Sequence, residues 1–484
     1  MKIKDRIVAL FQDSEFRAPV LKLLSGQGIA FVIGYIANII LMRMYPDEFW
    51  GTVDYIITWT TILIPVVSLR YEDALMLPTD RRQSAHAYLL AVGSTLFFSL
   101  VLLGALSFSD TLIQFFREKE IGMWSLFIPL AIVVHRLAKI TELWLTRQTA
   151  YNHISAGQIV QVGAMTGVRM GVGLVTIGPG GLIWGFISGY ALMFLTYSKR
   201  AWTTLKSSLG SRPTLSEVVF IAKRHRRFPF FTMPAALLSA MIMKAPFLIL
   251  LEYLELGTYG QFSRGFNVLF VPLSLLAGSV AQVFFVQAVK TNREGTLAKF
   301  SSNVHGKLVL MGIFPTAVLM VAGADIFEVL FGPEWRASGD FLLYMAPWIM
   351  LSIVSSPLTR LFDVLERQRL ELVTALISSA VIIGTLVGVG QTNDAGLVIM
   401  ALGIAGSAVR MGSIILLMRL SGTNLSTTFK PYLKYILTVS PILLALWAVS
   451  TLEIPIYTFV SALIGGLIFA AYILKTERLL AVNR

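Results

Sequence analysis

The sequence contains no cysteine and has few charged residues. Without cysteine there is no disulfide framework, thiolate nucleophile, cysteine-ligated zinc site or lipoprotein anchor. Asp, Glu, Lys and Arg make up 14% of the 484 residues, whereas soluble domains contain about 25%. Hydrophobic residues make up 56%. This balance excludes an ordinary soluble protein and predicts an all-α, polytopic membrane protein.

Motifs for catalysis are also absent. The chain has no GxxxxGK[ST] loop for a nucleotide phosphate, no HExxH pair for a metal and no GxSxG elbow for a nucleophilic serine. Its five histidines are scattered. The predicted outer loops are too short to hold a glycan acceptor. We therefore expect no enzymatic activity, no metal and no cofactor.

Long apolar runs fill nearly the whole chain. A membrane-spanning helix needs about 20 apolar residues with few charges, and about fourteen windows meet this description. They are 23–42, 51–70, 87–107, 122–143, 156–177, 181–197, 232–251, 258–284, 308–330, 340–360, 372–390, 396–417, 435–451 and 456–474.

The net charge of +13 comes mainly from basic residues in the loops. Basic residues crowd alternate connections, which is the positive-inside pattern. The outer loops hold only Arg43, Arg117, Lys119 and Arg336. The basic balance therefore reflects topology, predicts no nucleic-acid partner, and places both termini of this multi-pass protein in the cytoplasm.

The longest connection divides the chain after the sixth span. It carries KRHRR at 223–227 and a capping-box pattern, TLSE, at 214–217, and we interpret it as an amphipathic cytoplasmic linker helix. Its basic cluster either holds anionic lipid head groups or only fixes topology. Gly51 and Gly260 open corresponding spans, which indicates two repeated six-helix halves. The predicted segments are an amphipathic N-terminus (1–22), a six-helix bundle (23–197), the linker (198–231), a second six-helix bundle (232–417) and an extra helix pair with a cytoplasmic tail (418–484).

Several cations fall inside the predicted spans. A charge facing lipid at a helix centre costs about 2.5–3.5 kcal/mol, so deep cations should face a wet cavity or a partner. At about 1.5 Å per residue, the deepest are Lys244, Arg169 and Arg264, and we expect these to line a cavity. Four lie nearer the inner ends and either snorkel to head groups or contact substrate: Arg70, Arg136, Arg360 and Arg410. Lys139 is a further candidate for substrate binding.

The acids near the spans are fewer, so the cations favour an anionic cargo. Asp54, Glu72 and Asp73 are candidates for gating or for coupling to an ion gradient. In RYED, Arg70 and Asp73 are three residues apart and are predicted to pair on one helical face, with Glu72 pointing elsewhere. This segment is either a stop-transfer anchor or a gate whose ion pair holds one conformation.

A family resemblance rests on several longer segments. RMYPDEFWG at 43–51, RYEDALMLP at 70–78 and GQFSRGFNVLFVPLSLLAGSVAQVFF at 260–285 resemble the Wzx-type oligosaccharide flippases of the multidrug/oligosaccharidyl-lipid/polysaccharide exporter superfamily. So do RRFPFFTMP at 226–234, FGPEWRASGDFLLYMAPW at 331–348 and SSPLTRLFDVLERQRLE at 355–371. Asp73 stands where the family pattern is relaxed, so a role for it comes from the residues alone.

The resemblance implies two six-helix bundles around a central cavity, often with two extra helices. It also implies transfer of an undecaprenyl-pyrophosphate-linked oligosaccharide to the outer leaflet for surface polysaccharide synthesis, with lumenal arginines and lysines receiving the pyrophosphate. The resemblance also implies a place in the plasma (inner) membrane. The energy source is open, and because the chain has no nucleotide site, a proton or sodium gradient is the candidate. Glycan polymerase and export machinery are expected partners. The alternatives are a drug or small-molecule antiporter of the same superfamily and a non-transporting scaffold for glycan assembly.

Overall fold

The computed structural model describes residues 32–482, apart from positions 79, 110, 113, 116–120, 176, 177 and 393. Helices fill this part of the chain, and no strand occurs among the residues described. The predicted all-helical, polytopic membrane fold is therefore confirmed. The amphipathic N-terminus expected at 1–22, the start of the first span, and Arg117 and Lys119 lie outside the described residues.

The helices of the first half begin with Val32–Met44. They continue as α3 (Asp47–Ser68), α4 (Tyr71–Ala74), α5 (Arg81–Phe108), η1 (Gly122–Leu126), α7 (Phe127–Arg147), α8 (Tyr151–Gly173), α9 (Gly180–Leu209), α10 (Leu215–Arg224), η2 (Phe228–Thr232) and α11 (Met233–Tyr253).

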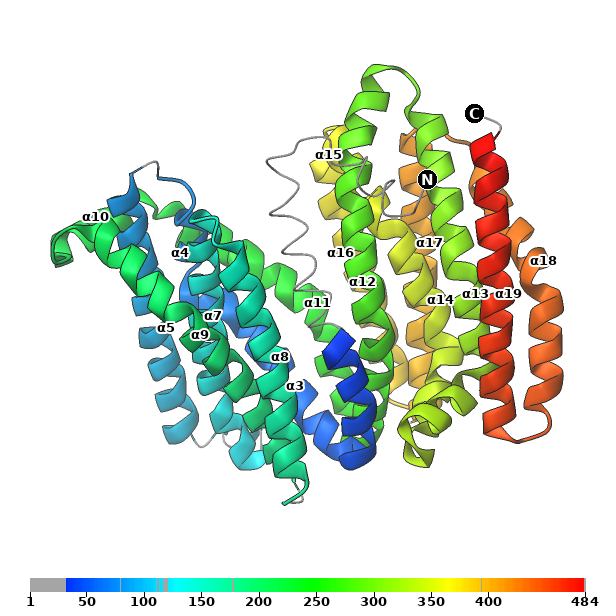
Figure 1. The fold of residues 1–484 in the computed structure, drawn as a ribbon, viewed down its shortest axis with the longest axis horizontal. Coiled ribbons are helices and arrows are strands. Elements are labelled where there is room, and N and C mark those ends of the chain that lie inside the picture. Colours follow the sequence, from blue (N-terminus) through cyan, green and yellow to red (C-terminus); the bar gives the residue numbers. More distant parts are fainter. Residues whose placement is uncertain are drawn as a thin grey trace. The chain divides into compact units, whose positions relative to one another are not determined.

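The second half contains the longest helices. They are α12 (Leu256–Arg293), α13 (Leu297–Phe331), η3 (Pro333–Trp335), α14 (Arg336–Leu358), α15 (Arg360–Val364), α16 (Gln368–Gly390), α17 (Ala395–Leu420), α18 (Leu425–Ser450) and α19 (Pro455–Val482). Figure 1 shows both sets of helices.

Each predicted span from the second to the fourteenth coincides with a helix of this series. Within the described residues, ten helices are long and apolar enough to cross a membrane, or eleven if the pair Phe228–Met241 and Met243–Tyr253, bent by 42°, counts as one span. The glycine-rich α8 is not among the ten, because Gln158, Gln161 and Arg169 lower its hydropathy. The exact number of fourteen therefore stays a prediction.

The chain divides into two compact units, Met1–Leu248 and Ile249–Arg484. In the first unit α7 and α8 pack on α9, and α3 and α7 pack on α5. In the second, α13 and α17 pack on α14, while α18 and α19 pack against α13. The Phe314 and Phe469 rings stack there with centroids 4.7 Å apart, so the terminal pair joins the core of the second unit.

The segments that were predicted to be cytoplasmic share one end of the first unit. Arg147, at the end of α7, donates hydrogen bonds to the carbonyl oxygens of Leu75 and Met76 in the loop after α4. The short helix α10 packs against the start of α5. Beneath them, Trp144 Nε1 donates to Thr204 Oγ1 at 2.9 Å. This arrangement agrees with the predicted alternation of loops in the first half, whereas the side of the membrane stays a prediction.

The connection at 198–231 is not one amphipathic helix. Helix α9 continues to Leu209, because nothing breaks it before Gly210, whose φ of 68° ends it. Helix α10 follows, and the predicted capping box is confirmed: Thr214 and Glu217 cap its first turn reciprocally. The π-helical turn η2 then leads into α11.

Candidate functional site

The backbone is strained where the second span ends. Pro65 lies inside α3, and because proline has no N–H, the carbonyl of Thr61 loses its helical donor. One turn later α3 stops, and Leu69 (φ 50°, ψ 18°) and Arg70 (φ 58°, ψ 20°) both adopt the left-handed conformation. Each such residue without glycine's freedom costs about 1–2 kcal/mol. Two in succession therefore mark a position that the surrounding contacts must hold.

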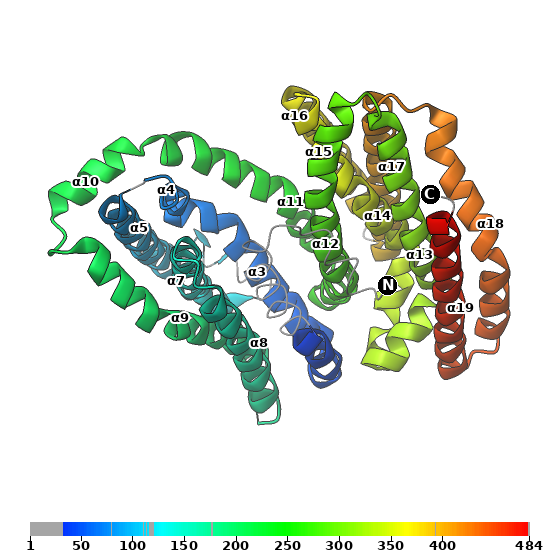
Figure 2. The same ribbon diagram turned by 45° about the horizontal axis from the view of Figure 1, so that its top comes forward.

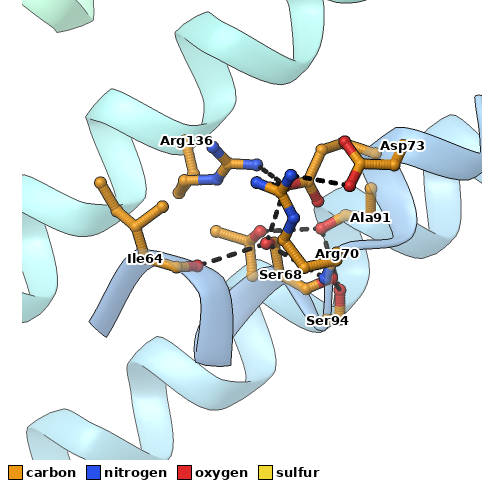
Figure 3. Close-up of polar contacts among 9 residues, drawn as sticks. Ile64, Ser68, Arg70, Asp73, Ala91, Ser94 and Arg136 are labelled. Carbon is orange, nitrogen blue, oxygen red and sulfur yellow. Dashed lines mark hydrogen bonds and ion pairs between the residues drawn. The ribbon is translucent and has the colours of Figure 1, made fainter. Parts of the chain in front are cut away.

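The predicted Arg70–Asp73 pair is present. Arg70 Nη2 lies 2.8 Å from Asp73 Oδ2, and both side chains are about one-third exposed. The expected reason was wrong, however, because the two residues do not share a continuous helix: Arg70 precedes α4 as its left-handed N-cap. Figure 3 shows the two side chains pointing toward one another.

The prediction that Glu72 points elsewhere was also wrong. Glu72 is buried, with 6% of its side chain exposed, and its Oε1 lies 2.5 Å from Nη2 of Arg136 on α7. Arg70 Nη1 lies 3.6 Å from the same oxygen, and Ser68 Oγ lies within hydrogen-bond distance of it at 3.2 Å. Two guanidinium groups therefore face one buried carboxylate, and Asp73 balances the second positive charge.

Arg136 is the main residue that sequence reasoning missed at this site. It was expected either to snorkel to the head groups or to contact substrate. Instead its side chain is 8% exposed and paired with Glu72, which lies in a different helix of the same unit. The available signal was an arginine within the fourth span, at the same predicted end of the bundle as the two acids of RYED.

The strained turn is also tied to α5. Ser94 Oγ donates to the carbonyl oxygen of Ser68 at 3.2 Å, which is the last carbonyl of α3 and has no helical partner because the helix ends there. The Arg70 backbone N–H lies 3.4 Å from Ser68 Oγ. Figure 3 shows Ser68, Ser94 and Arg70 gathered at the turn, with Arg136 approaching from α7. Three helices therefore hold one turn in place.

Asp73 lies just outside the span, in α4. Burial raises the pKa of its carboxyl above the ordinary value, and the Arg70 guanidinium opposes this. We call Arg70, Glu72, Asp73 and Arg136 the charge cluster; its two guanidinium groups and two carboxylates balance in charge.

Arg169 is packed between helices of the first unit. Its side chain is buried at 9% exposure, its Nε donates to the carbonyl oxygen of Leu182 at 3.3 Å, and its guanidinium carbon lies 5.8 Å from the centroid of the Trp50 ring. Gly185 makes this possible, because a Cβ there would lie 2.3 Å from Arg169 Cγ. This packing supports the helices directly, and a role in binding substrate stays a prediction.

The other predicted cations lie in varied surroundings. Lys139 pairs with Glu142 at 2.9 Å, and the exposed Arg360 pairs with Asp363 at 3.3 Å, in each case within one turn of the same helix. Lys244, half-buried on α11, lies with Nζ 5.2 Å from the centroid of the Phe247 ring. Lys139 and Lys244, which belong to the first unit, make these contacts outside the charge cluster.

Arg264 and Asp54 occupy different helices. Arg264 is half-buried on α12, and the neighbouring Gly265 lies so close to α14 that a Cβ would be 3.3 Å from the carbonyl oxygen of Ser338. Gly265 therefore allows α12 and α14 to approach closely. Asp54 is buried on α3 at 5% exposure. Among the described residues, no group of three or more His, Asp or Glu side chains could hold a metal ion.

Similarity to known proteins identifies the family of this chain. A family model described as polysaccharide biosynthesis protein matches residues 40–340, which is more than half of the chain. The chain belongs to the polysaccharide biosynthesis protein family. The resemblance proposed from its sequence segments is thereby confirmed. A comparison with curated protein sequences found no match.

Solved structures show the fold of this polysaccharide biosynthesis protein. A lipid II flippase, MurJ, in its inward closed conformation is similar over 94% of this chain and 99% of its own, with a TM-score of 0.66 and 14% sequence identity. An inward-facing multidrug resistance MATE family transporter of the MOP superfamily is similar over 83% of this chain and 98% of its own, with a TM-score of 0.52 and 12% identity. At these identities the likeness concerns the fold.

Proposed function

We propose that this protein is a flippase that moves an undecaprenyl-pyrophosphate-linked oligosaccharide from the cytoplasmic to the outer leaflet of the plasma membrane by alternating access. The family match over residues 40–340 carries this proposal. The likeness in fold to a lipid II flippase supports it. Such a protein serves synthesis of a surface polysaccharide, beside a glycan polymerase and export machinery.

The intramembrane cations supply the chemistry for this cargo. A pyrophosphate esterified at both ends carries two negative charges, and arginine binds phosphate oxygens in pairs with its planar fork. We assign pyrophosphate binding to Arg264, Lys244 and Arg169, with Arg70, Lys139 and Arg360 as further contacts. The acids Asp54, Glu72 and Asp73 are the candidates for coupling to a proton or sodium gradient and for gating.

Deletion of the protein in its host tests this function. We expect the undecaprenyl-linked oligosaccharide to accumulate on the inner leaflet, and surface polysaccharide to be lost. Complementation with the Arg264→Ala variant should fail although the variant is present in the membrane. Normal surface glycan in the deletion strain would contradict the proposal.

A drug or small-molecule antiporter is the second candidate, because a MATE family transporter shares the fold with a TM-score of 0.52. That function predicts drug sensitivity with normal surface glycan in the same deletion strain. A non-transporting scaffold predicts a third outcome: loss of glycan would be rescued by a variant from which every intramembrane cation has been removed.

A further inference from the structure

Helix α10 has one face fixed to the protein. Ile221 on this face is 1% exposed. Arg82 Nη2, in the first turn of α5, lies 2.6 Å from Glu217 Oε1, and Arg224 Nη1 donates to Gln83 Oε1 at 3.0 Å. Hydrogen bonds from Thr214 lower the pKa of Glu217 to about 2. Glu217 therefore stays charged at physiological pH, and the contact with Arg82 is maintained.

The opposite face of α10 is apolar and uncovered. Leu215 is 80% exposed, Val219 42% and Phe220 57%. At 3.6 residues per turn, Leu215 and Val219 lie together on the side away from Ile221, and Phe220 lies about 100° further round the helix. Large apolar side chains exposed beside Lys223 are typical of a helix that lies in the membrane interface.

The position of α10 along the bundle identifies that environment. Arg82 and Gln83, which hold α10, are the first residues of α5, an apolar helix long enough to cross the membrane. Helix α10 therefore lies level with the end of a span, where acyl chains meet head groups. Figure 2 shows α10 running alongside the start of α5.

The charges at the end of α10 indicate which head groups lie there. Lys223, Arg226 and Arg227 are exposed, and no acidic residue occurs between positions 218 and 227. Basic side chains next to exposed leucine and phenylalanine are typical of helices that lie in the membrane interface and prefer anionic lipid. A soluble protein partner would meet this mixed face only by displacing lipid at the same depth.

We propose that α10 is an interfacial helix that binds anionic phospholipid. Lys223, Arg226 and Arg227 contact the head groups, and Leu215, Val219 and Phe220 enter the boundary of the acyl chains. This surface is separate from the intramembrane cations assigned to the transported substrate.

The bound lipid acts on the charge cluster through the fixed face of α10. Tyr71 OH donates to the carbonyl oxygen of Ala222 on α10 at 3.5 Å, and Tyr71 is the first residue of α4, between Arg70 and Glu72. Anionic lipid that holds α10 in place therefore also stabilises the turn at Leu69 and Arg70. The lipid composition of the membrane therefore affects the stability of the same turn that we propose as a gate.

The absence of cysteine makes the test direct. In the full-length protein, Phe220→Cys provides a unique site for an environment-sensitive fluorophore. The labelled protein is placed in nanodiscs of phosphatidylcholine alone or of phosphatidylcholine with phosphatidylglycerol. We expect a blue-shifted emission that is quenched by brominated lipid, with both effects larger in phosphatidylglycerol and reduced by high salt. Inorganic phosphate added to phosphatidylcholine nanodiscs should not reproduce them.

A triple variant and a matched control separate head-group binding from general surface charge. Each basic residue near an anionic surface strengthens binding about fivefold, so Lys223→Gln/Arg226→Gln/Arg227→Gln should weaken the response to phosphatidylglycerol on the order of a hundredfold. Lys290→Gln/Arg293→Gln/Lys299→Gln removes three exposed charges from the second unit and should leave the response unchanged.

Two results would overturn the inference. One is water-like emission at position 220 in both kinds of nanodisc. The other is an unchanged response to phosphatidylglycerol in the first triple variant. No transported substrate enters these measurements, so their outcome is independent of whether the protein is a flippase.

Discussion

The buried pair of Arg136 and Glu72 offers the most direct measurement of what holds the strained turn. Arg136→Ala removes the guanidinium 2.5 Å from Glu72 Oε1, where both side chains are less than one-tenth exposed. Removing one partner of a buried ion pair costs about 3–5 kcal/mol, because the other charge stays buried without compensation. Arg70 Nη1 remains 3.6 Å from the same oxygen and compensates in part.

We therefore expect Arg136→Ala to lower the free energy of unfolding by about 3 kcal/mol, the lower end of that range. This loss corresponds to roughly a hundredfold shift toward the unfolded protein. Denaturant unfolding in detergent micelles, followed by tryptophan fluorescence, measures the change. The double variant Glu72→Gln/Arg136→Met removes both charges and should recover most of the loss, since apolar or neutral replacements of a buried pair are tolerated.

Arg70→Ala is the matched control, because it removes an arginine from the same charge cluster at a more exposed position. Its contact with Asp73 is about one-third exposed on both sides, and such pairs contribute about 0–1 kcal/mol. The reasoning fails if Arg136→Ala unfolds within about 0.5 kcal/mol of the wild type, or if the double variant is no more stable than Arg136→Ala alone.

Three further predictions concern other parts of the chain. Arg264→Ala should nearly abolish export of lipid-linked oligosaccharide although the variant is present in the membrane at the normal level. Arg264→Lys keeps the charge but loses the fork, so it should retain part of the export. Full export in Arg264→Ala would refute the assignment. Glu453 is exposed in the turn after α18 with φ 55°, so Glu453→Gly should stabilise the protein by about 1 kcal/mol in thermal unfolding, whereas Glu453→Ala should not. Because the pKa of Glu217 is lowered to about 2, its negative charge stabilises the packing of α10 on α5 in full above the ordinary glutamate pKa. This stabilisation is lost as the pH falls toward 2. His86 Nε2 on α5 lies 3.4 Å from Glu217 Oε2, so the test uses a His86→Gln background. There a fluorescence distance between α10 and α5 should not change from pH 7 to pH 5, and a change in that interval that Glu217→Gln abolishes would contradict this.

The helical architecture was predictable because it rests on local composition. Runs of about 20 apolar residues can satisfy their backbone in a membrane only as helices, and the later thirteen windows all coincide with helices. The capping box at Thr214 and Glu217 was equally predictable, because its two hydrogen bonds join residues three positions apart. The extent of α9 was not, since a charged sequence without glycine or proline continues a helix past the membrane surface as readily as it ends one.

The charge cluster was predictable only where it is local. Arg70 and Asp73 are close in sequence, and their pair was expected. Arg136 lies 64 positions from Glu72, and only the packing of α7 against α3 brings the two together. The left-handed turn could not be predicted from the sequence either, because Leu69 and Arg70 have no preference for that conformation. It is imposed by ion pairs and by Ser94, which no local rule includes.

In the first unit, direct contacts connect the strained turn with the charge cluster and with α10. Strained residues persist only where their surroundings over-determine them, and here Arg136 of α7, Ser94 of α5 and Ala222 of α10 each contact residues between Ser68 and Glu72. Relaxing the turn into a continuous helix would move Arg70 and Glu72 relative to α7, so the ion pairs and the strain must be released together. Packed elements favour discrete arrangements over a continuous range. We therefore propose that this turn has a second arrangement in the transport cycle, and that a proton on Asp73 or lipid on α10 shifts the balance between the two.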